Sequence, residues 1–250
     1  MPAQTRKQRE IAQRHSLFLE VGRELLHQNG FHQLSMDQVA EQAEYSKGTL
    51  YQHFHCKEEM LIQLCIQCMQ GLSYLGERAV TFPGTHRQRL IAFQIAHELW
   101  LAVEPRDLYM LQYVNLDGVL SKVAESSLAE FRQMEAKIIS LCASIFQDAM
   151  DCGDLPKGEL NAAELVYGVW SMCYGGQLLR SYETPLAEMG VSNPGRTLTS
   201  LLQSTLDGLR WTPASTPEQT DALLLHLETE YFTEAIAHLR EGCCSTSSRG

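Results

Sequence analysis

Residues 35–60 constrain the fold of this 250-residue chain more than any other segment, because they specify two short helices joined by a tight turn. Ser35 and Gln38 form a capping box, in which the serine hydroxyl accepts a backbone N–H and the glutamine side chain returns to the cap amide. The pattern predicts that one helix begins at Met36. Ser46 is a second capping residue and predicts that another helix begins directly after it.

The second predicted helix, which extends to about Phe54, presents a polar outer face. Leu50 and Phe54 are four positions apart and share its buried side. The other side chains carry a cation, hydroxyls, an amide and an imidazole, which are groups that bind base edges and phosphates. Two ordinary surface helices are the alternative interpretation. The candidate DNA-binding residues are Ser35, Ser46, Lys47, Gly48, Thr49, Tyr51, Gln52, His53 and Lys57.

The motifs around this segment have a specific spacing. Gly30-Phe31 ends the preceding helix, SKGTLYQHF occupies residues 46–54, and Lys57-Glu58-Glu59-Met60 opens the next helix. With these motifs, residues 18–61 resemble the DNA-binding region of the TetR family of bacterial transcriptional regulators. The resemblance implies an all-α protein with an N-terminal three-helix helix-turn-helix domain, residues 1–56. A larger helical ligand-binding and dimerisation domain, residues 57–250, is expected to follow.

Two positions depart from the family pattern. Glu44 stands where the family usually has glycine, at a left-handed turn residue that ends the first short helix. We expect the turn to form with some steric cost. Cys56 stands where the family commonly has serine or a similar cap, and a thiol caps poorly. The helix that begins at Lys57 is therefore expected to start more loosely than usual.

The charge is divided unevenly along the chain. Residues 1–57 carry seven Lys and Arg against six Asp and Glu, and the remainder carries 13 against 24. An acidic body repels DNA everywhere except at the DNA-binding segment, which favours a modular DNA-binding protein. No apolar stretch approaches the roughly 18 to 20 residues that span a bilayer, and the N-terminus lacks the apolar core of a signal peptide. We therefore expect a cytoplasmic protein without a membrane partner.

Nearly the whole chain is expected to be helical, since almost no segment alternates like a strand. In the resembled family, the last two helices of the body form a four-helix bundle with a second copy. Residues 161–181 and 194–209 occupy that place and imply a homodimer. An additional C-terminal helix, residues 218–240, is expected either to pack across the body or to extend the dimer interface.

The resemblance also implies a ligand pocket among the helices that begin near residues 86, 106, 121 and 161. Large aromatic and methionine side chains in these helices suit an apolar or aromatic small molecule, although ordinary core packing explains each of them equally well. The candidate ligand-binding residues are Phe93, Trp100, Tyr109, Tyr113, Met134, Trp170 and Tyr174.

The cysteines offer a second type of sensor. Cys65 and Cys68 are spaced to lie on one helix face, where burial as small apolar groups is the default and a metal or redox pair is the alternative. Cys56 stands at a helix start beside Lys57, where an inert thiol is the default and a reactive thiol with a lowered pKa is the alternative. No catalytic motif, cofactor motif or complete metal motif is present in the sequence, so an enzyme is not expected.

The sequence thus predicts a ligand-responsive regulator, most simply a repressor that a small molecule releases from a palindromic double-stranded DNA operator. We expect Lys47 to contact a base edge, and Thr49, Tyr51, His53 and Lys57 to contact phosphates or to make mixed contacts. Two alternatives remain open. One is a thiol- or metal-sensing regulator of the same fold, and the other is a DNA-bound adaptor that recruits another protein.

Overall fold

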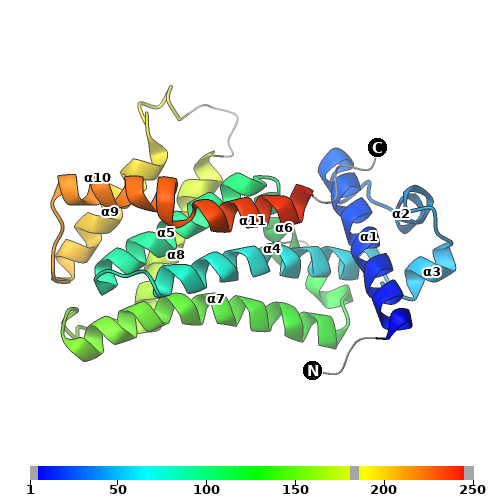
Figure 1. The fold of residues 1–250 in the computed structure, drawn as a ribbon, viewed down its shortest axis with the longest axis horizontal. Coiled ribbons are helices and arrows are strands. Elements are labelled where there is room, and N and C mark those ends of the chain that lie inside the picture. The colour runs from blue at the N-terminus through cyan, green and yellow to red at the C-terminus, as the bar shows by residue number, and fades with distance from the viewer. Residues whose placement is uncertain (1–4, 117, 181–185, 245–250) are drawn as a thin grey trace. The chain divides into compact units, whose positions relative to one another are not determined.

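The computed structural model describes residues 5–116, 118–180 and 186–244, and within these ranges it contains helices and no strand (Figure 1). The all-α prediction is therefore confirmed. The helices are α1 (Arg6–Asn29), α2 (Met36–Gln42), α3 (Lys47–Tyr51), α4 (Lys57–Val80), α5 (His86–Val103), α6 (Asp107–Leu116), η1 (Val119–Lys122), α7 (Glu125–Cys152), α8 (Ala162–Arg180), α9 (Pro194–Gly208), α10 (Pro217–His226), η2 (Leu227–Tyr231) and α11 (Thr233–Cys244).

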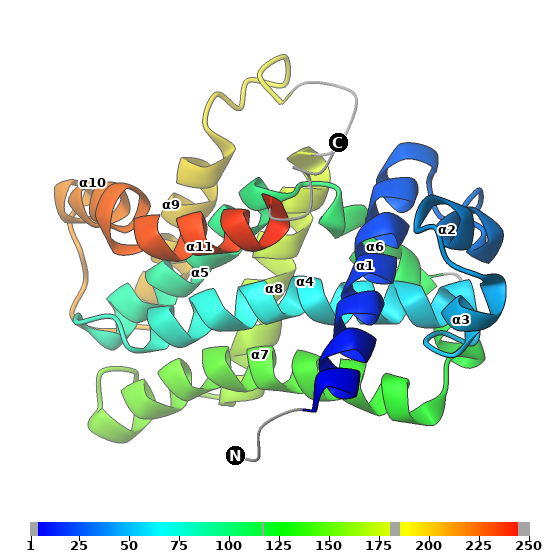
Figure 2. The ribbon, with the colours of Figure 1, turned by 45° about the vertical axis from the view of Figure 1, so that its right-hand side comes forward.

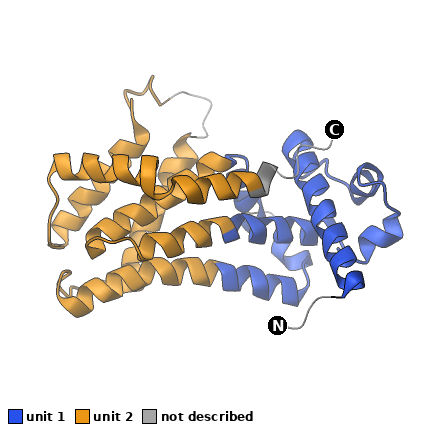
Figure 3. Cartoon of the chain, viewed as in Figure 1, with its two compact units in different colours: residues 1–70, 104–134, 243–250 blue, residues 71–103, 135–242 orange. Residues whose placement is uncertain are grey.

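The chain divides into two compact units (Figure 3). Unit 1 contains residues 1–70, 104–134 and 243–250, and unit 2 contains residues 71–103 and 135–242. The long helices α4 and α7 each contribute residues to both units, and they run side by side in both ribbon views (Figures 1 and 2). The functional division predicted from the sequence, at residue 56, stays a prediction.

Helix α1 anchors the first part of unit 1. A capping box between Thr5 and Gln8 fixes its start at Arg6. Gly30 ends it with φ +74°, a left-handed value that glycine adopts without steric cost. One face of the helix supplies core residues to this unit, namely Phe18, Leu19, Val21, Leu25 and Leu26.

Unit 2 is held together by an apolar core and by one buried cation. Trp211 packs on Phe146 with the ring centroids 5.2 Å apart. Arg87, at the start of α5, is only 1% exposed, and its guanidinium donates to Gln203 Oε1, Gln203 O, Asp207 Oδ1 and Trp211 O. A buried arginine is tolerated only when its N–H groups have such acceptors. Arg87 therefore joins the start of α5 to the end of α9.

The C-terminal segment packs across α4 and α5 within unit 2, which was one of the two predicted alternatives. Tyr231 Oη donates to Arg78 O at 2.8 Å, and Leu239 lies close to Gly71. The prediction of one continuous helix over 218–240 was wrong. A π-helical turn, η2, interrupts it between α10 and α11, and this turn lies where Leu227 and Phe232 are fully buried.

None of the helices in the described ranges is both long enough and apolar enough to cross a lipid bilayer.

Candidate nucleic-acid interface

The turn between α2 and α3 depends on Glu44. The capping box of Ser35 and Gln38 is present as predicted, and α2 ends where Glu44 adopts φ +58°. Tyr45 N donates to Ala40 O at 3.0 Å and Glu44 N donates to Glu41 O at 3.1 Å, which together form a Schellman motif. The predicted left-handed residue is confirmed. Glutamate adopts this conformation at a cost of about 1 kcal/mol.

Helix α3 begins as predicted but is shorter. Ser46 Oγ accepts from Thr49 N at 3.1 Å, while Leu50 and Phe54 are fully buried. The regular helix ends at Tyr51, because the amides of Gln52 and His53 bond to carbonyls only three residues back. The prediction that it runs to Phe54 was therefore too long. The two inward side chains nevertheless fix which face of α3 points outward.

The outward face of α3 carries Lys47, Gly48, Tyr51 and Gln52, which are all exposed. Lys47 Nζ lies 2.6 Å from Asp37 Oδ2 of α2, and the hydrogen bond to this carboxylate raises the lysine pKa. A Cβ atom at position 48 would meet only Ser46 Oγ, at 3.8 Å. No neighbour among the described residues therefore requires glycine there, which is consistent with a close approach of DNA to this backbone.

Three other candidate side chains are partly occupied inside the protein. The Ser35 hydroxyl caps α2, and Thr49 Oγ1 lies 2.8 Å from Ser46 Oγ. The His53 ring is half-buried against Phe18, with the centroids 5.3 Å apart. Burial lowers the pKa of His53, and the charge of Arg14 lowers it further. The imidazole is therefore less available than predicted, and DNA contacts by these residues stay predictions.

Lys57 has an internal position. Its Nζ donates to Phe31 O at 3.1 Å and Leu34 O at 3.2 Å, and it lies 4.5 Å from the centre of the Phe31 ring. These contacts join the start of α4 to the segment between α1 and α2. The expected phosphate contact would have to share or replace these bonds, so we now assign Lys57 mainly a structural role.

Replacing Lys57 tests this assignment. Lys57→Met keeps an apolar side chain over Phe31 but removes the donors to two carbonyls, so it is expected to lower the free energy of unfolding by about 1 to 2 kcal/mol. Urea denaturation measures this loss. The salt dependence of DNA binding is expected to be unchanged. If stability is unaltered and the slope of the logarithm of the binding constant against the logarithm of the salt concentration falls by about one, Lys57 contacts a DNA phosphate instead.

A partly buried ion pair, which the sequence reasoning missed, joins α1 to α6 in unit 1. Arg23 Nη1 lies 2.9 and 2.8 Å from the two carboxylate oxygens of Asp107, and His27 Nε2 lies 3.4 Å from Oδ1. Burial opposes ionisation of Asp107, but the nearby His27 imidazole and the charge of Arg23 lower its pKa. The pair fixes the DNA-binding helices to α6. Only the tertiary fold reveals it, because the partners are 84 positions apart.

The candidate ligand-binding residues do not form one cluster in either unit. In unit 1, Tyr113 packs against Phe31 with the centroids 4.5 Å apart, Tyr109 is 52% exposed and Met134 is half-buried. In unit 2, Trp100 is buried, Phe93 lies close to Gly76, and Trp170 and Tyr174 contact each other on α8. Their ligand-binding role stays a prediction.

Unit 2 contains a cavity of about 600 Å³, and none of the candidate ligand residues lines it. Its wall combines apolar side chains with two ion pairs, Glu98 with Arg180 and Arg196 with Asp221. Glu228 has its pKa raised by burial and, to a smaller extent, by the charge of Glu98. The lining residues are Ile95, Glu98, Arg180, Asn193, Pro194, Gly195, Arg196, Thr199, Asp221, Leu224, Leu225 and Glu228.

Cys56 does not have the lowered thiol pKa that a reactive cysteine would have at this position. Burial raises the pKa of its thiol, and the negative charge of Glu58 acts in the same direction. Backbone hydrogen bonds at the start of α4 lower it, but by less. The raised pKa agrees with the inert thiol, the favoured interpretation of the sequence, and not with the reactive alternative, because the helix terminus does not compensate for burial. Cys65 and Cys68 are buried, as the default interpretation predicted.

The geometry defines the class of protein. A short capped helix presents its outer face to solvent, follows a left-handed turn and is supported by two earlier helices. This is the arrangement of a helix-turn-helix DNA-binding protein, in which the second of the two short helices enters the major groove.

The N-terminal segment also matches a known protein family. Residues 18–64 match the family model described as "Bacterial regulatory proteins, tetR family". The predicted resemblance to the TetR family is confirmed over these residues, which contain the helix-turn-helix. Proteins of this kind generally are not enzymes.

Solved structures of regulators share the fold. The TetR-family regulator PfmR from Thermus thermophilus is 20% identical, with a TM-score of 0.56, and the match covers 78% of this chain and 98% of that one. A tetR-family regulatory protein from Rhodococcus is 14% identical, with a TM-score of 0.61 and coverages of 80% and 98%. The fatty acid degradation regulator FadR from Bacillus halodurans is 15% identical, with a TM-score of 0.60 and coverages of 78% and 100%. No curated protein matches the sequence.

Proposed function

We propose that the protein is a homodimeric repressor that binds a palindromic operator and is released from it by a small molecule. The observation that carries ligand release is the cavity in unit 2. Its volume of about 600 Å³ is in the usual range for small-molecule sites.

The chemistry of the cavity wall indicates the class of ligand. Ile95, Leu224 and Leu225 offer apolar surface, while Arg180 and Arg196 offer cations that are already paired with carboxylates. This mixture suits an amphipathic molecule with an apolar body and a charged or strongly polar group. The ligand predicted from the aromatic residues was purely apolar or aromatic, and this proposal replaces that ligand class.

The proposed dimer rests on the outer face of α8. Ala163, Tyr167, Trp170 and Tyr174 recur at helical spacing and share one side of this helix. Tyr167 is 70% exposed and Trp170 is 50% exposed, which leaves large apolar surface in contact with water. Leu201 of the neighbouring helix α9 is also exposed, at 52%. A second copy would bury these side chains and bring two DNA-binding segments into one molecule, as a palindromic site requires.

The ion pair between Arg23 and Asp107 supplies a route for the signal. It joins α1 of the DNA-binding region to α6, so we expect α1 to follow any change in the position of α6. Release then requires only that the ligand has a higher affinity for the conformation that does not fit DNA than for the conformation that does.

The cavity is tested by titrating operator-bound protein with a metabolite library and measuring fluorescence anisotropy. Arg196→Ala and Leu225→Ala are expected to raise the releasing concentration about tenfold, a typical coupling effect, while operator affinity without ligand stays within about twofold. Both residues are well exposed, so the variants are expected to fold. Lys137→Ala, on α7 and paired with Glu77, is the matched control.

The same assay distinguishes the cavity from the aromatic residues predicted earlier. If Trp100→Phe and Phe93→Leu change the releasing concentration while Arg196→Ala and Leu225→Ala do not, the ligand binds elsewhere than in this cavity. If no compound in the library releases the protein, ligand release itself loses its support.

A further inference from the structure

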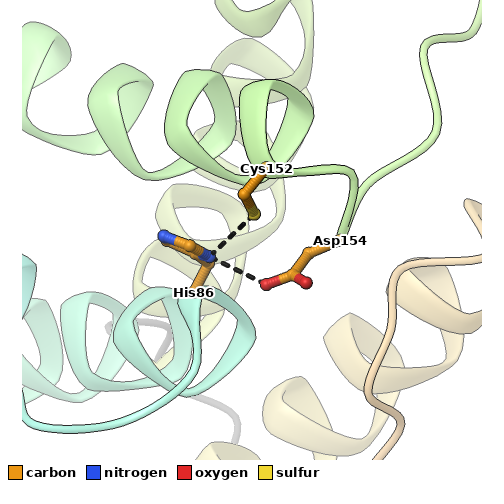
Figure 4. Close-up of side chains that lie close together, drawn as sticks. All are labelled: His86, Cys152 and Asp154. Atoms are coloured by element: carbon orange, nitrogen blue, oxygen red, sulfur yellow. Dashed lines mark hydrogen bonds and ion pairs between the residues drawn. The ribbon is translucent and has the colours of Figure 1, made fainter.

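Three side chains of different donor chemistry meet in unit 2, where α5 begins and α7 ends (Figure 4). His86 is the first residue of α5, Cys152 is the last of α7, and Asp154 follows in the next turn. His86 Nδ1 lies 2.9 Å from Asp154 Oδ2 and 3.6 Å from Cys152 Sγ. We propose that these residues bind a divalent transition-metal ion such as Zn²⁺, a site that no sequence motif indicated.

The distances suit a tetrahedral ion. With Zn–N and Zn–O bonds of about 2.0 to 2.1 Å and a Zn–S bond of about 2.3 Å, tetrahedral angles place nitrogen and sulfur about 3.6 Å apart. The observed separation of Nδ1 and Sγ is 3.6 Å. The same geometry requires about 3.3 Å between nitrogen and oxygen, so the carboxylate has to move outward by less than half an ångström from its present 2.9 Å.

The donor set selects the kind of ion. A thiolate and an imidazole are ligands of zinc and its neighbours, whereas magnesium and calcium prefer only oxygen. On binding, the Cys152 thiol releases one proton to solvent, and Nδ1 of neutral His86 gives its lone pair to the metal while the ring proton resides on Nε2. With the Asp154 carboxylate, the two negative ligands balance the two positive charges. Three protein ligands leave a fourth position for water.

The backbone holds the ligands in place without a metal. Asp154 O accepts from Thr212 N at 2.8 Å, and Leu155 N donates to Ala149 O at 3.0 Å across the end of α7. Gly153 adopts φ +89°, which allows the chain to turn directly after Cys152. Arg87, next to His86, fixes the start of α5 to α9. A ligand set that is preorganised in this way loses little entropy when the ion binds.

The site is tested on the full-length, reduced protein after chelator treatment, by titration with Co²⁺. Cys243→Ser and Cys244→Ser are introduced first as a common background, because adjacent thiols near the end of the chain can bind metal themselves. We expect one equivalent of Co²⁺ with a thiolate-to-cobalt charge-transfer band. Zn²⁺ is expected to displace it, and the melting temperature is expected to rise when Zn²⁺ is added, since the ion binds the folded state.

Variants identify the ligands. Cys152→Ser is expected to abolish the charge-transfer band, and His86→Gln and Asp154→Asn are each expected to weaken Co²⁺ binding at least tenfold. Cys56→Ser and Cys173→Ser are the matched controls and keep both the band and the affinity. Circular dichroism checks that every variant is folded, and the isosteric Asp154→Asn serves if another variant is not.

Two results would overturn the proposal. One is the absence of stoichiometric Co²⁺ binding in the folded background protein. The other is a charge-transfer band that survives Cys152→Ser, since the thiolate would then come from another residue.

Discussion

The variants Tyr167→Arg and Trp170→Arg are expected to be monomeric and to lose at least about 100-fold in operator affinity, because a dimer binds its two half-sites with avidity that a monomer lacks. Each change places a cation in the middle of the exposed apolar face of α8. In a dimer that cation would be buried without a partner, which strongly opposes association. Sedimentation velocity measures the oligomeric state, and anisotropy measures operator binding.

Ile139→Arg is the matched control. Ile139 is also an exposed apolar residue of unit 2, at 41%, but it lies on α7. This variant is expected to remain dimeric. Because Tyr167 and Trp170 are at least half exposed in the single chain, their replacement is not expected to unfold the protomer. If Tyr167→Arg still sediments as a dimer, the interface lies elsewhere, and the additional C-terminal helices α10 and α11 are the first alternative.

The second large effect is expected from Lys47→Ala, which removes the first exposed cation of α3. The variant is expected to weaken specific operator binding about 5- to 150-fold and to relax preference at one base pair, as is typical when one base contact is lost. Binding to random DNA is expected to change much less. The measurement compares the dissociation constants for operator and random duplexes across a series of single base-pair changes.

Asp37→Asn separates the contribution of the Lys47–Asp37 ion pair from the contact that Lys47 itself makes with DNA. This change breaks the ion pair with Lys47 but leaves the lysine in place, and it removes a negative charge beside the DNA-binding face. Operator affinity is expected to stay the same or to increase. An equal loss of affinity in Lys47→Ala for operator and random DNA would show that Lys47 binds phosphate rather than a base.

Features set by neighbouring residues could be predicted from the sequence. The capping box at Ser35, the second cap at Ser46 and the left-handed conformation of Glu44 are all decided within a few residues, and the structure confirms each of them. The inward positions of Leu50 and Phe54 follow in the same way from helical periodicity.

Features that join distant residues could not be predicted. The ammonium of Lys57 binds carbonyls 23 and 26 positions away, so a lysine that looks available in sequence is occupied in the fold. His86 and Cys152 are 66 positions apart and belong to no metal-binding motif. Large aromatic residues satisfy core packing and ligand binding equally well, and for this reason composition alone did not find the cavity.

The hydrogen bonds of Arg87 have a consequence for the order in which the chain acquires its structure during synthesis. The acceptors that satisfy its guanidinium lie 116 to 124 positions further along the chain. Until the ribosome has released residues 203–211, this cation has to remain hydrated and the contact between α5 and α9 cannot form. Translation proceeds at about 5 to 20 residues per second, so the nascent chain waits several seconds with the DNA-binding segment already emerged and unit 2 still incomplete.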